Sequence, residues 1–194
     1  MSRQPDPGHP ATPSDFYAIP EDERFHELIA GDIVQKGSPS GPRGLAQAGL
    51  IGELFPRFNR KPGGRWPGGW VFLVEVEIAL GRDICRPDVA GWRRERLPDI
   101  PTQSPIHVRP DWTAEVLSTN RQNDLIRKKH IYHREGVPHY WIVDPEEQML
   151  TVHRHHPDGY IEVLAAVRAD RVRAEPFEAI EFAVGVLFGD EMED

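Results

Sequence analysis

Four carboxylates interrupt apolar stretches that otherwise alternate like β-strands. Glu75 and Glu77 lie in VFLVEVEIAL, Asp88 lies in ICRPDVAGW, and Glu115 lies in DWTAEVL. A carboxylate that faces the interior of a sheet is destabilised by desolvation unless a cation or a hydrogen-bond donor meets it. Several such acids close together favour a hard, oxygen-rich site for a divalent cation. For Glu75 and Glu77 alone, exposure on a half-buried sheet is the simpler interpretation.

A lysine on a later segment could complete such a site. Asp124, Lys128 and Tyr132 are spaced four residues apart, so they share one face of a helix. Asp88 directly follows Pro87, and a proline in a strand belongs at an edge or a bulge, where a side chain can be re-aimed. A surface ion pair between Asp124 and Lys128 is the alternative interpretation of this spacing.

The sequence pattern also predicts the elements that position these side chains. It indicates a β-hairpin over 25–34, helices over 45–58 and 120–135, and strands over 71–80, 84–92, 111–117 and 138–144. Two further strands, MLTVH and YIEVLAAV, follow. Thr119 with Gln122 is typical of a capping box at the start of the second helix, and Gly136 is typical of its end. This order predicts an α/β (α+β) domain whose mixed sheet has one crossover helix.

Length and composition predict one domain. The chain has 194 residues, 39% of them hydrophobic, and one cysteine. Residues 1–15 hold four prolines and are predicted to be a disordered arm, residues 16–190 the domain, and residues 191–194 an acidic tail. No apolar stretch approaches 20 residues and no leader pattern precedes the domain, so a cytoplasmic protein without a membrane segment is expected. The net charge of −8 is concentrated in acidic ends around a mildly basic middle.

Three sequence runs carry a family resemblance: RPDVAGWRRERLP (86–98), DWTAEVLSTN (111–120) and DLIRKKHIYHREGVPHYWIVDP (124–145). They resemble the Uma2 family, also called DUF820, of restriction-endonuclease-like proteins, and the resemblance covers roughly residues 25–190. That family is similar to the PD-(D/E)XK nucleases, whose core has the order α-β-β-β-α-β. The resemblance therefore implies a restriction-endonuclease-like core with additional strands at both ends.

The resemblance also implies catalytic residues. Asp88 corresponds to the acid of the PD pair, and Glu115 corresponds to the acid of the (D/E)XK element. Leu117 stands where that element usually has its lysine. Lys128 on the following helix is implied to take over, orienting a water molecule or stabilising the phosphorane, and Lys129 is its adjacent competitor.

The implied cofactor is Mg²⁺, with Mn²⁺ as a substitute. Its ligands would be Asp88, Glu115 and the main-chain carbonyl of Val116, and Glu77 and Glu27 resemble accessory positions of the family. Nucleic acid, with DNA favoured, is the implied partner. The basic residues expected to contact it are Arg86, Arg93, Arg121 and Lys129.

The expected function is Mg²⁺-dependent hydrolysis of phosphodiester bonds by an endonuclease. The alternative is a catalytically inactive nuclease-fold module that binds nucleic acid or regulates, which Leu117 and the negative net charge favour. A zinc protein is disfavoured despite nine histidines, because no Cys/His pairs have ligand spacing. Nucleases that cut both strands commonly pair two active sites, which favours a homodimer.

Overall fold

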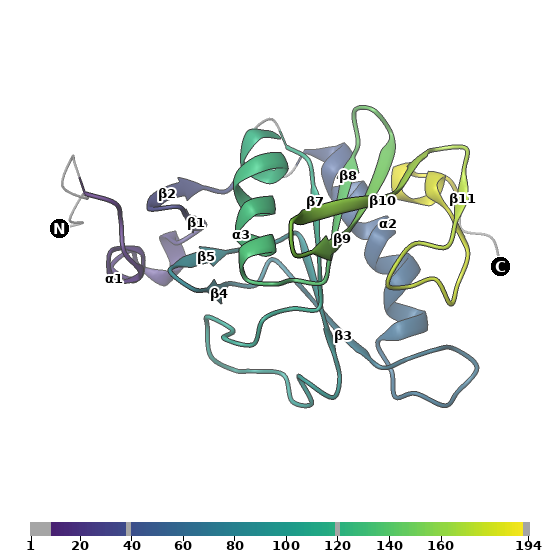
Figure 1. The fold of residues 1–194 in the computed structure, drawn as a ribbon, viewed down its shortest axis with the longest axis horizontal. Helices are drawn as coiled ribbons and strands as arrows, with labels where there is room; N and C mark the ends of the chain where they lie inside the picture. The colour runs from purple at the N-terminus through teal and green to yellow at the C-terminus, as the bar shows by residue number, and fades with distance from the viewer. Residues whose placement is uncertain (1–8, 38–39, 119–120, 192–194) are drawn as a thin grey trace.

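A computed structural model describes residues 9–37, 40–118 and 121–191 of the chain. Within these ranges the strands form a six-stranded sheet, a four-stranded sheet and a small two-stranded ribbon (Figure 1). No helix of the described residues is both long and apolar enough to cross a membrane. The expected capping box at Thr119 and the tail residues 192–194 lie outside these ranges.

The large sheet has the strand order β10-β9-β8-β7-β6-β3. Its strands are β3 (Trp70–Val74), β6 (Val89–Arg93), β7 (Trp112–Val116), β8 (His139–Asp144), β9 (Met149–His156) and β10 (Gly159–Val167). Strands β7 and β8 are parallel, and the remaining neighbours in this described sheet are antiparallel. The predicted mixed sheet is therefore confirmed, with the crossover helix placed between the two parallel strands.

The small sheet has the order β2-β1-β5-β4. Its strands are β1 (His26–Ile29), β2 (Asp32–Gln35), β4 (Ile78–Leu80) and β5 (Asp83–Cys85). Strands β1 and β2 form the predicted hairpin, which turns at Ala30 and Gly31, both with positive φ. The ribbon pairs β11 (Arg171–Val172) with β12 (Phe182–Ala183).

The predicted continuous strands over 71–80 and 84–92 are wrong, because each is divided between the two sheets. The first breaks at Glu75, whose φ of 55° is left-handed and ends the pairing of β3. The second breaks at residues 86–88, where Pro87 has no N–H to donate to a ladder. The breaks place Glu75 directly after β3 and Asp88 directly before β6, where these two strands of the large sheet end.

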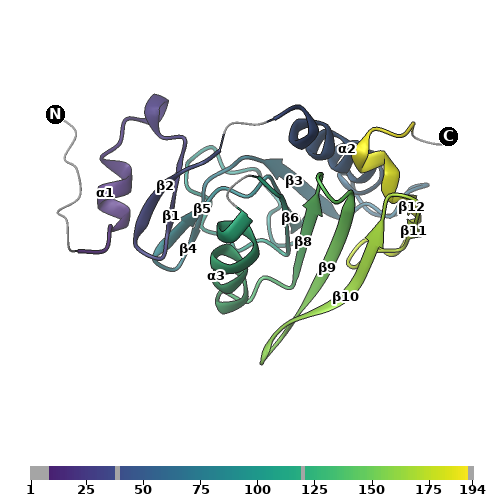
Figure 2. The ribbon, with the colours of Figure 1, turned by 90° about the horizontal axis from the view of Figure 1, so that it is seen from above.

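Two helices cover opposite faces of the large sheet (Figure 2). Helix α2 (Gly41–Phe58) packs Leu50 and Leu54 against the face that carries Trp112 and Val116. The other face is covered by the π-helical turn η2 (Asn123–Lys128), which continues into α3 (Lys129–Arg134). The second helix ends as predicted at Gly136, whose φ is 70°.

Helix α2 begins earlier than the predicted residue 45, because the Ser40 hydroxyl caps it. The helix ends at Phe58 as predicted, and Pro56 lies inside its last turn. The remaining helices are α1 (Pro13–Tyr17) and the 3₁₀ turns η1 (Glu21–Glu23) and η3 (Val184–Phe188).

Residues 11–15, which were predicted to belong to a disordered arm, are held by the rest of the protein. Thr12 and Asp15 form a reciprocal capping box that starts α1, and Phe16 is fully buried. The N–H of Ala11 also donates to the carbonyl of Gly31 at 2.7 Å, which joins this segment to the β1–β2 turn. Residues 1–8 lie outside the described part of the chain.

Helix α2 approaches the turn η3 very closely at Gly49. A Cβ added there would lie 2.5 Å from the carbonyl oxygen of Val186 and 3.1 Å from the Cα of Leu187. Gly49→Ala should therefore lower the free energy of unfolding by about 1–3 kcal/mol, as overpacking does. Gly44→Ala in the same helix has open space around its Cβ and should raise that free energy by up to about 1 kcal/mol. Urea unfolding measures the change in the free energy of unfolding for each variant. If Gly49→Ala and Gly44→Ala shift it in the same direction, the close packing at Gly49 is contradicted.

His153 in β9 is buried, and its Nδ1 has no hydrogen-bond partner in the described structure. Burial, reinforced by the charge of Lys129, lowers the pKa of His153 to about 4. Because the unfolded chain takes up this proton near pH 6.5, the contribution of His153 to stability is intact above that pH. It is lost as the pH falls towards 4.

The expected consequence is a difference between wild type and His153→Phe. Between pH 7 and pH 5 the wild type should lose about 1–2 kcal/mol more free energy of unfolding than the variant does. Urea denaturation at the two pH values measures this difference. The contributions of the other histidines cancel, because wild type and variant share them. Parallel stability curves would show that His153 is not buried in its neutral form.

Candidate active site

Asp88 and Glu115 lie side by side at one end of the large sheet. Val89 of β6 pairs with Ala114 of β7 in antiparallel register, which brings the preceding Asp88 next to Glu115. The Val116 N–H donates to Asp88 Oδ2 at 2.7 Å. Both carboxylates are almost fully buried, Asp88 at 1% and Glu115 at 0% exposure.

Lys128 approaches Glu115 from η2, the helical turn that leads into α3 and covers the face of the large sheet opposite α2. Its Nζ lies 3.0 Å from Glu115 Oε2, 3.0 Å from Glu27 Oε1 and 3.2 Å from Asp124 Oδ1. Tyr132 donates its hydroxyl to the other oxygen, Glu115 Oε1, at 2.7 Å. The predicted helix face of Asp124, Lys128 and Tyr132 is thus brought onto Glu115. The alternative of a surface ion pair is wrong, because both of its members are buried.

Lys128 lies at the C-terminal end of the π-helical turn η2. Single π turns inside helices are frequent at functional sites, because they change the direction of side chains. Burial alone would lower the pKa of Lys128, but the charges of Glu115, Glu27 and Asp124 outweigh it and hold that pKa well above its usual range. Lys128 therefore remains an ammonium, whereas burial raises the pKa of Glu115.

Two further cations meet Asp88. Arg43 Nη2 donates to Asp88 Oδ1 at 2.5 Å, and Lys36 Nζ lies 3.0 Å from the same oxygen. Lys36 also donates to Glu75 Oε2 and to the Arg86 carbonyl, each at 2.6 Å. Burial tends to raise the pKa of Asp88, but Lys36 and Arg43 outweigh this effect and lower it.

Lys36 and Arg43 are site residues that the sequence analysis missed, and Glu75 joins the cluster through Lys36 although exposure was the simpler interpretation for it. Lys36 follows β2, and Arg43 belongs to a segment rich in Gly, Pro and Ser that precedes the predicted helix over 45–58. Ser40 followed by Pro42 is a helix-start signal and could have placed Arg43 in the first turn of α2. Nothing in the sequence signals that Glu75 leaves the strand to reach Lys36.

The charges of this cluster do not balance. Among the described residues, Glu27, Glu75, Asp88, Glu115 and Asp124 supply five carboxylates, and Lys36, Arg43 and Lys128 supply three cations. With every group ionised, two negative charges are left over. Burial raises the pKa of Glu115 to about 8, so a proton on Glu115 would remove part of this excess, and a divalent cation would balance all of it.

The chemistry of the donors suits Mg²⁺ or Mn²⁺. Asp88, Glu115 and the Val116 carbonyl are hard oxygen donors, which these ions prefer. Within the described residues, no three side chains of His, Cys, Asp or Glu are arranged to hold a metal ion. The predicted set of two carboxylates and one carbonyl fits in kind, with Arg43 in contact with two of its members.

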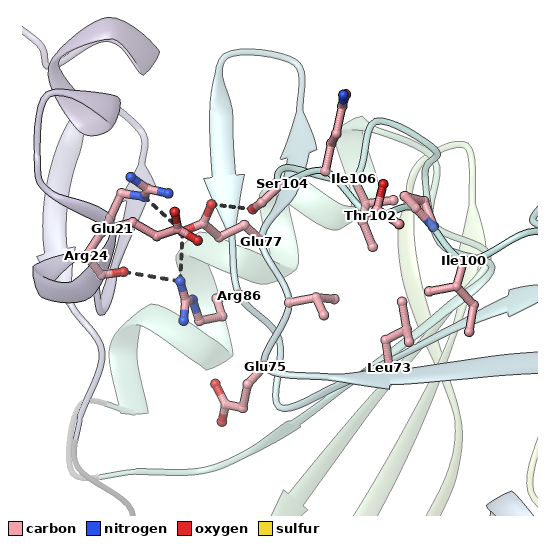
Figure 3. A pocket seen from close by; sticks show the side chains of 13 residues that line it. Glu21, Arg24, Leu73, Glu75, Glu77, Arg86, Ile100, Thr102, Ser104 and Ile106 are labelled. Carbon is pink, nitrogen blue, oxygen red and sulfur yellow. Dashed lines mark hydrogen bonds and ion pairs between the residues drawn. The ribbon is translucent and has the colours of Figure 1, made fainter.

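The two predicted accessory acids differ in position. Glu27 belongs to the cluster, because its Oε1 accepts from the Arg86 N–H at 2.7 Å and lies beside Lys128. Glu77 does not. Figure 3 shows it held by Arg24, Arg86 and Ser104 at the wall of a pocket of about 370 Å³, and its contacts with these three residues account for both carboxylate oxygens.

The four basic residues expected to contact nucleic acid do not form one patch around the acids. Arg93 ends β6, at the opposite end from Asp88, and covers the ring of Trp70. Arg86 is bound to Glu77. Arg121 pairs with Asp144 beside a second pocket, which Leu117 also lines. Lys129 is partly exposed on α3.

Comparisons with known proteins find relatives of the chain in sequence and in fold. Residues 13–185 match the model of the Uma2 family, which is described as "Putative restriction endonuclease". Among solved structures, the chain is similar to one described as a "putative nuclease belonging to DUF820" from Anabaena variabilis ATCC 29413. The TM-score is 0.74 at 22% identity, and the match covers 92% of this chain and 98% of the other. No curated protein matches the chain.

The fold and the family together indicate a restriction-endonuclease-like nuclease. The match to the family model spans most of the chain, including both segments that carry the buried acids. The chain therefore belongs to the Uma2 family.

Proposed function

We propose that the protein is an endonuclease that hydrolyses phosphodiester bonds in DNA with the help of a divalent cation, Mg²⁺ or Mn²⁺. The observation that supports this best is the convergence of Asp88, Glu115 and Lys128 in one buried cluster at adjacent ends of β6 and β7. The excess of carboxyl groups over cationic side chains in the cluster adds support, because a bound cation would allow all of the carboxyl groups to ionise.

The residues of the chain have distinct proposed roles. Asp88, Glu115 and the Val116 carbonyl would hold the cation, which lowers the pKa of a bound water and neutralises charge on the phosphate. Lys128 and Tyr132 donate to the two oxygens of Glu115 and fix its orientation. Lys36 and Lys128 also line a small pocket of about 20 Å³, and their amines would stabilise the charge of a phosphate group held at the cation.

A cleavage assay with several substrates tests the proposal. Plasmid DNA, single-stranded DNA and RNA are incubated with the purified protein in Mg²⁺, Mn²⁺ or EDTA. We expect DNA to be cut with either metal ion and to remain intact in EDTA. An Asp88→Asn protein purified in parallel controls for contaminating nuclease. Intact DNA under all metal conditions would overturn the proposal, and cleavage of RNA alone would overturn the choice of DNA.

One observation favours a second candidate, a nuclease-fold module without turnover. Every oxygen of Asp88 and Glu115 already has a partner inside the protein, including three cationic side chains. Such a module would bind DNA equally well in Mg²⁺ and in EDTA. Gel-shift titrations in the two buffers separate it from a metal-dependent enzyme that binds but cuts slowly.

A further inference from the structure

Arg43 contacts two of the three groups that would bind the proposed cation. Its Nη2 donates to Asp88 Oδ1 at 2.5 Å, and its Nε donates to the Val116 carbonyl oxygen at 3.1 Å. Its Nη1 donates to the Gly37 carbonyl at 3.1 Å, which holds the third corner of the guanidinium. The residue is only 6% exposed, so little water competes for these hydrogen bonds.

The Arg43 contacts have the geometry of a bridge. The Val116 N–H donates to Asp88 Oδ2, while Arg43 joins Asp88 Oδ1 to the Val116 carbonyl. The flat guanidinium, with several donors in fixed directions, can reach both acceptors at once. Asp88 and Val116 are thereby held at a fixed separation without any metal ion.

A divalent cation that uses Asp88 Oδ1 has to compete with Arg43, because this oxygen already has both Arg43 and Lys36 as partners. Arg43 does not lose its proton in proteins, so it stays cationic at any working pH. Arg43 and Lys36 already share Asp88 Oδ1, and both would repel a third cation on that oxygen strongly in a buried site, where the effective dielectric constant is low. One of the two side chains therefore has to move when the divalent cation binds.

Lys36 differs from Arg43 in this respect. It contacts Asp88, but its two shortest contacts, both 2.6 Å, are to Glu75 and to the Arg86 carbonyl. Those two acceptors are not among the expected metal ligands. Lys36 can therefore keep its position when Asp88 turns to a cation, whereas Arg43 loses both its carboxylate and its Val116 partner.

We propose that Arg43 is a positioning residue that holds Asp88 and the Val116 carbonyl in the metal-free protein and is displaced when a divalent cation binds. This inference rests on the proposed function, since it takes the same oxygens as the metal ligands. Arg43 then sets the affinity of the protein for the cation, because each binding event includes the cost of breaking its two bonds.

Direct measurement of Mn²⁺ binding tests the proposal without any cleavage assay. Electron paramagnetic resonance of free Mn²⁺ gives the dissociation constant for the full chain as wild type, Arg43→Gln and Arg43→Lys. We expect Arg43→Gln to bind Mn²⁺ at least about tenfold more tightly than wild type, because the competing charge is gone. Arg43→Lys should fall between them, since a single ammonium cannot bridge both acceptors.

A matched control comes from the same helix. Arg57 also pairs with a buried acid, Glu53, at the far end of α2. Arg57→Gln should leave the Mn²⁺ affinity unchanged. A second measurement, the rise in melting temperature at fixed Mn²⁺, should be larger for Arg43→Gln than for wild type or Arg57→Gln, because ligand stabilisation follows affinity.

The outcomes separate this inference from the function on which it rests. If wild type binds Mn²⁺ and the two Arg43 variants bind it no more tightly, the displacement is wrong and the metal site stands. If wild type and both variants show no binding, or if Asp88→Asn binds Mn²⁺ as wild type does, the metal site itself is wrong. Should Arg43→Gln fail to fold, Arg43→Lys alone decides the first question.

Discussion

Asp88→Asn should lower the rate of Mg²⁺-dependent DNA cleavage by roughly 10²–10³-fold or more, as the loss of one preorganised charged group typically does. The asparagine keeps the shape of the side chain and its contact with the Val116 N–H. It removes the negative charge that meets Arg43 and Lys36 and that would bind the cation. Initial rates of plasmid nicking at saturating Mg²⁺ measure the effect.

Asp111→Asn is the matched control for this prediction. Asp111 is also a buried acid bound to an arginine, Arg96, but it precedes β7 at the end away from Glu115. Its substitution should change the cleavage rate less than about threefold. A cleavage rate of Asp88→Asn within tenfold of wild type would contradict the assignment of Asp88.

Lys128→Met should lower the free energy of unfolding by about 3–5 kcal/mol, the usual cost of leaving buried charges without their partner. Methionine fills a similar volume, so packing changes little. The loss is electrostatic, because Glu115, Glu27 and Asp124 remain in the interior without the ammonium that they share. Urea denaturation at pH 7, followed by circular dichroism, measures the change.

The neighbouring lysine provides the control for Lys128. Lys129 is partly exposed, so Lys129→Met should change the free energy of unfolding by less than about 0.5 kcal/mol. Adding Glu115→Gln to Lys128→Met should recover part of the loss, because one of the unpaired carboxylates is removed. If Lys128→Met is as stable as Lys129→Met, the buried ammonium does not exist in solution.

Much of the framework that holds the acids could be predicted from local patterns. The alternation in DWTAEVL gave β7 and its two faces, and the four-residue spacing of Asp124, Lys128 and Tyr132 gave the helix face that reaches Glu115. Both patterns are set by side-chain periodicity within one element. Their meeting depended only on a short connection between β7 and the next helix.

The missed parts depend on contacts between distant segments. The apolar alternation over 71–80 predicts a strand that continues past Glu75. In the structure the backbone of Glu75 is left-handed, and tertiary contacts such as its hydrogen bond from Lys36 stabilise that conformation. Arg43 reaches Asp88 across 45 residues of sequence. No periodicity within a segment can report such a contact, because the partner is chosen by how the two sheets and α2 pack.

The two breaks in the predicted strands also link the behaviour of the two sheets. Glu27 and Lys36 come from the small sheet and its exit, while Asp88 and Glu115 belong to the end of the large one. The ion pairs of the buried cluster therefore join the two sheets, which share no strand-to-strand hydrogen bonds within the described residues. Local opening of the N-terminal hairpin would take one lysine and one acid away, so amide hydrogen exchange in β1 and β2 should report directly on whether the centre is assembled.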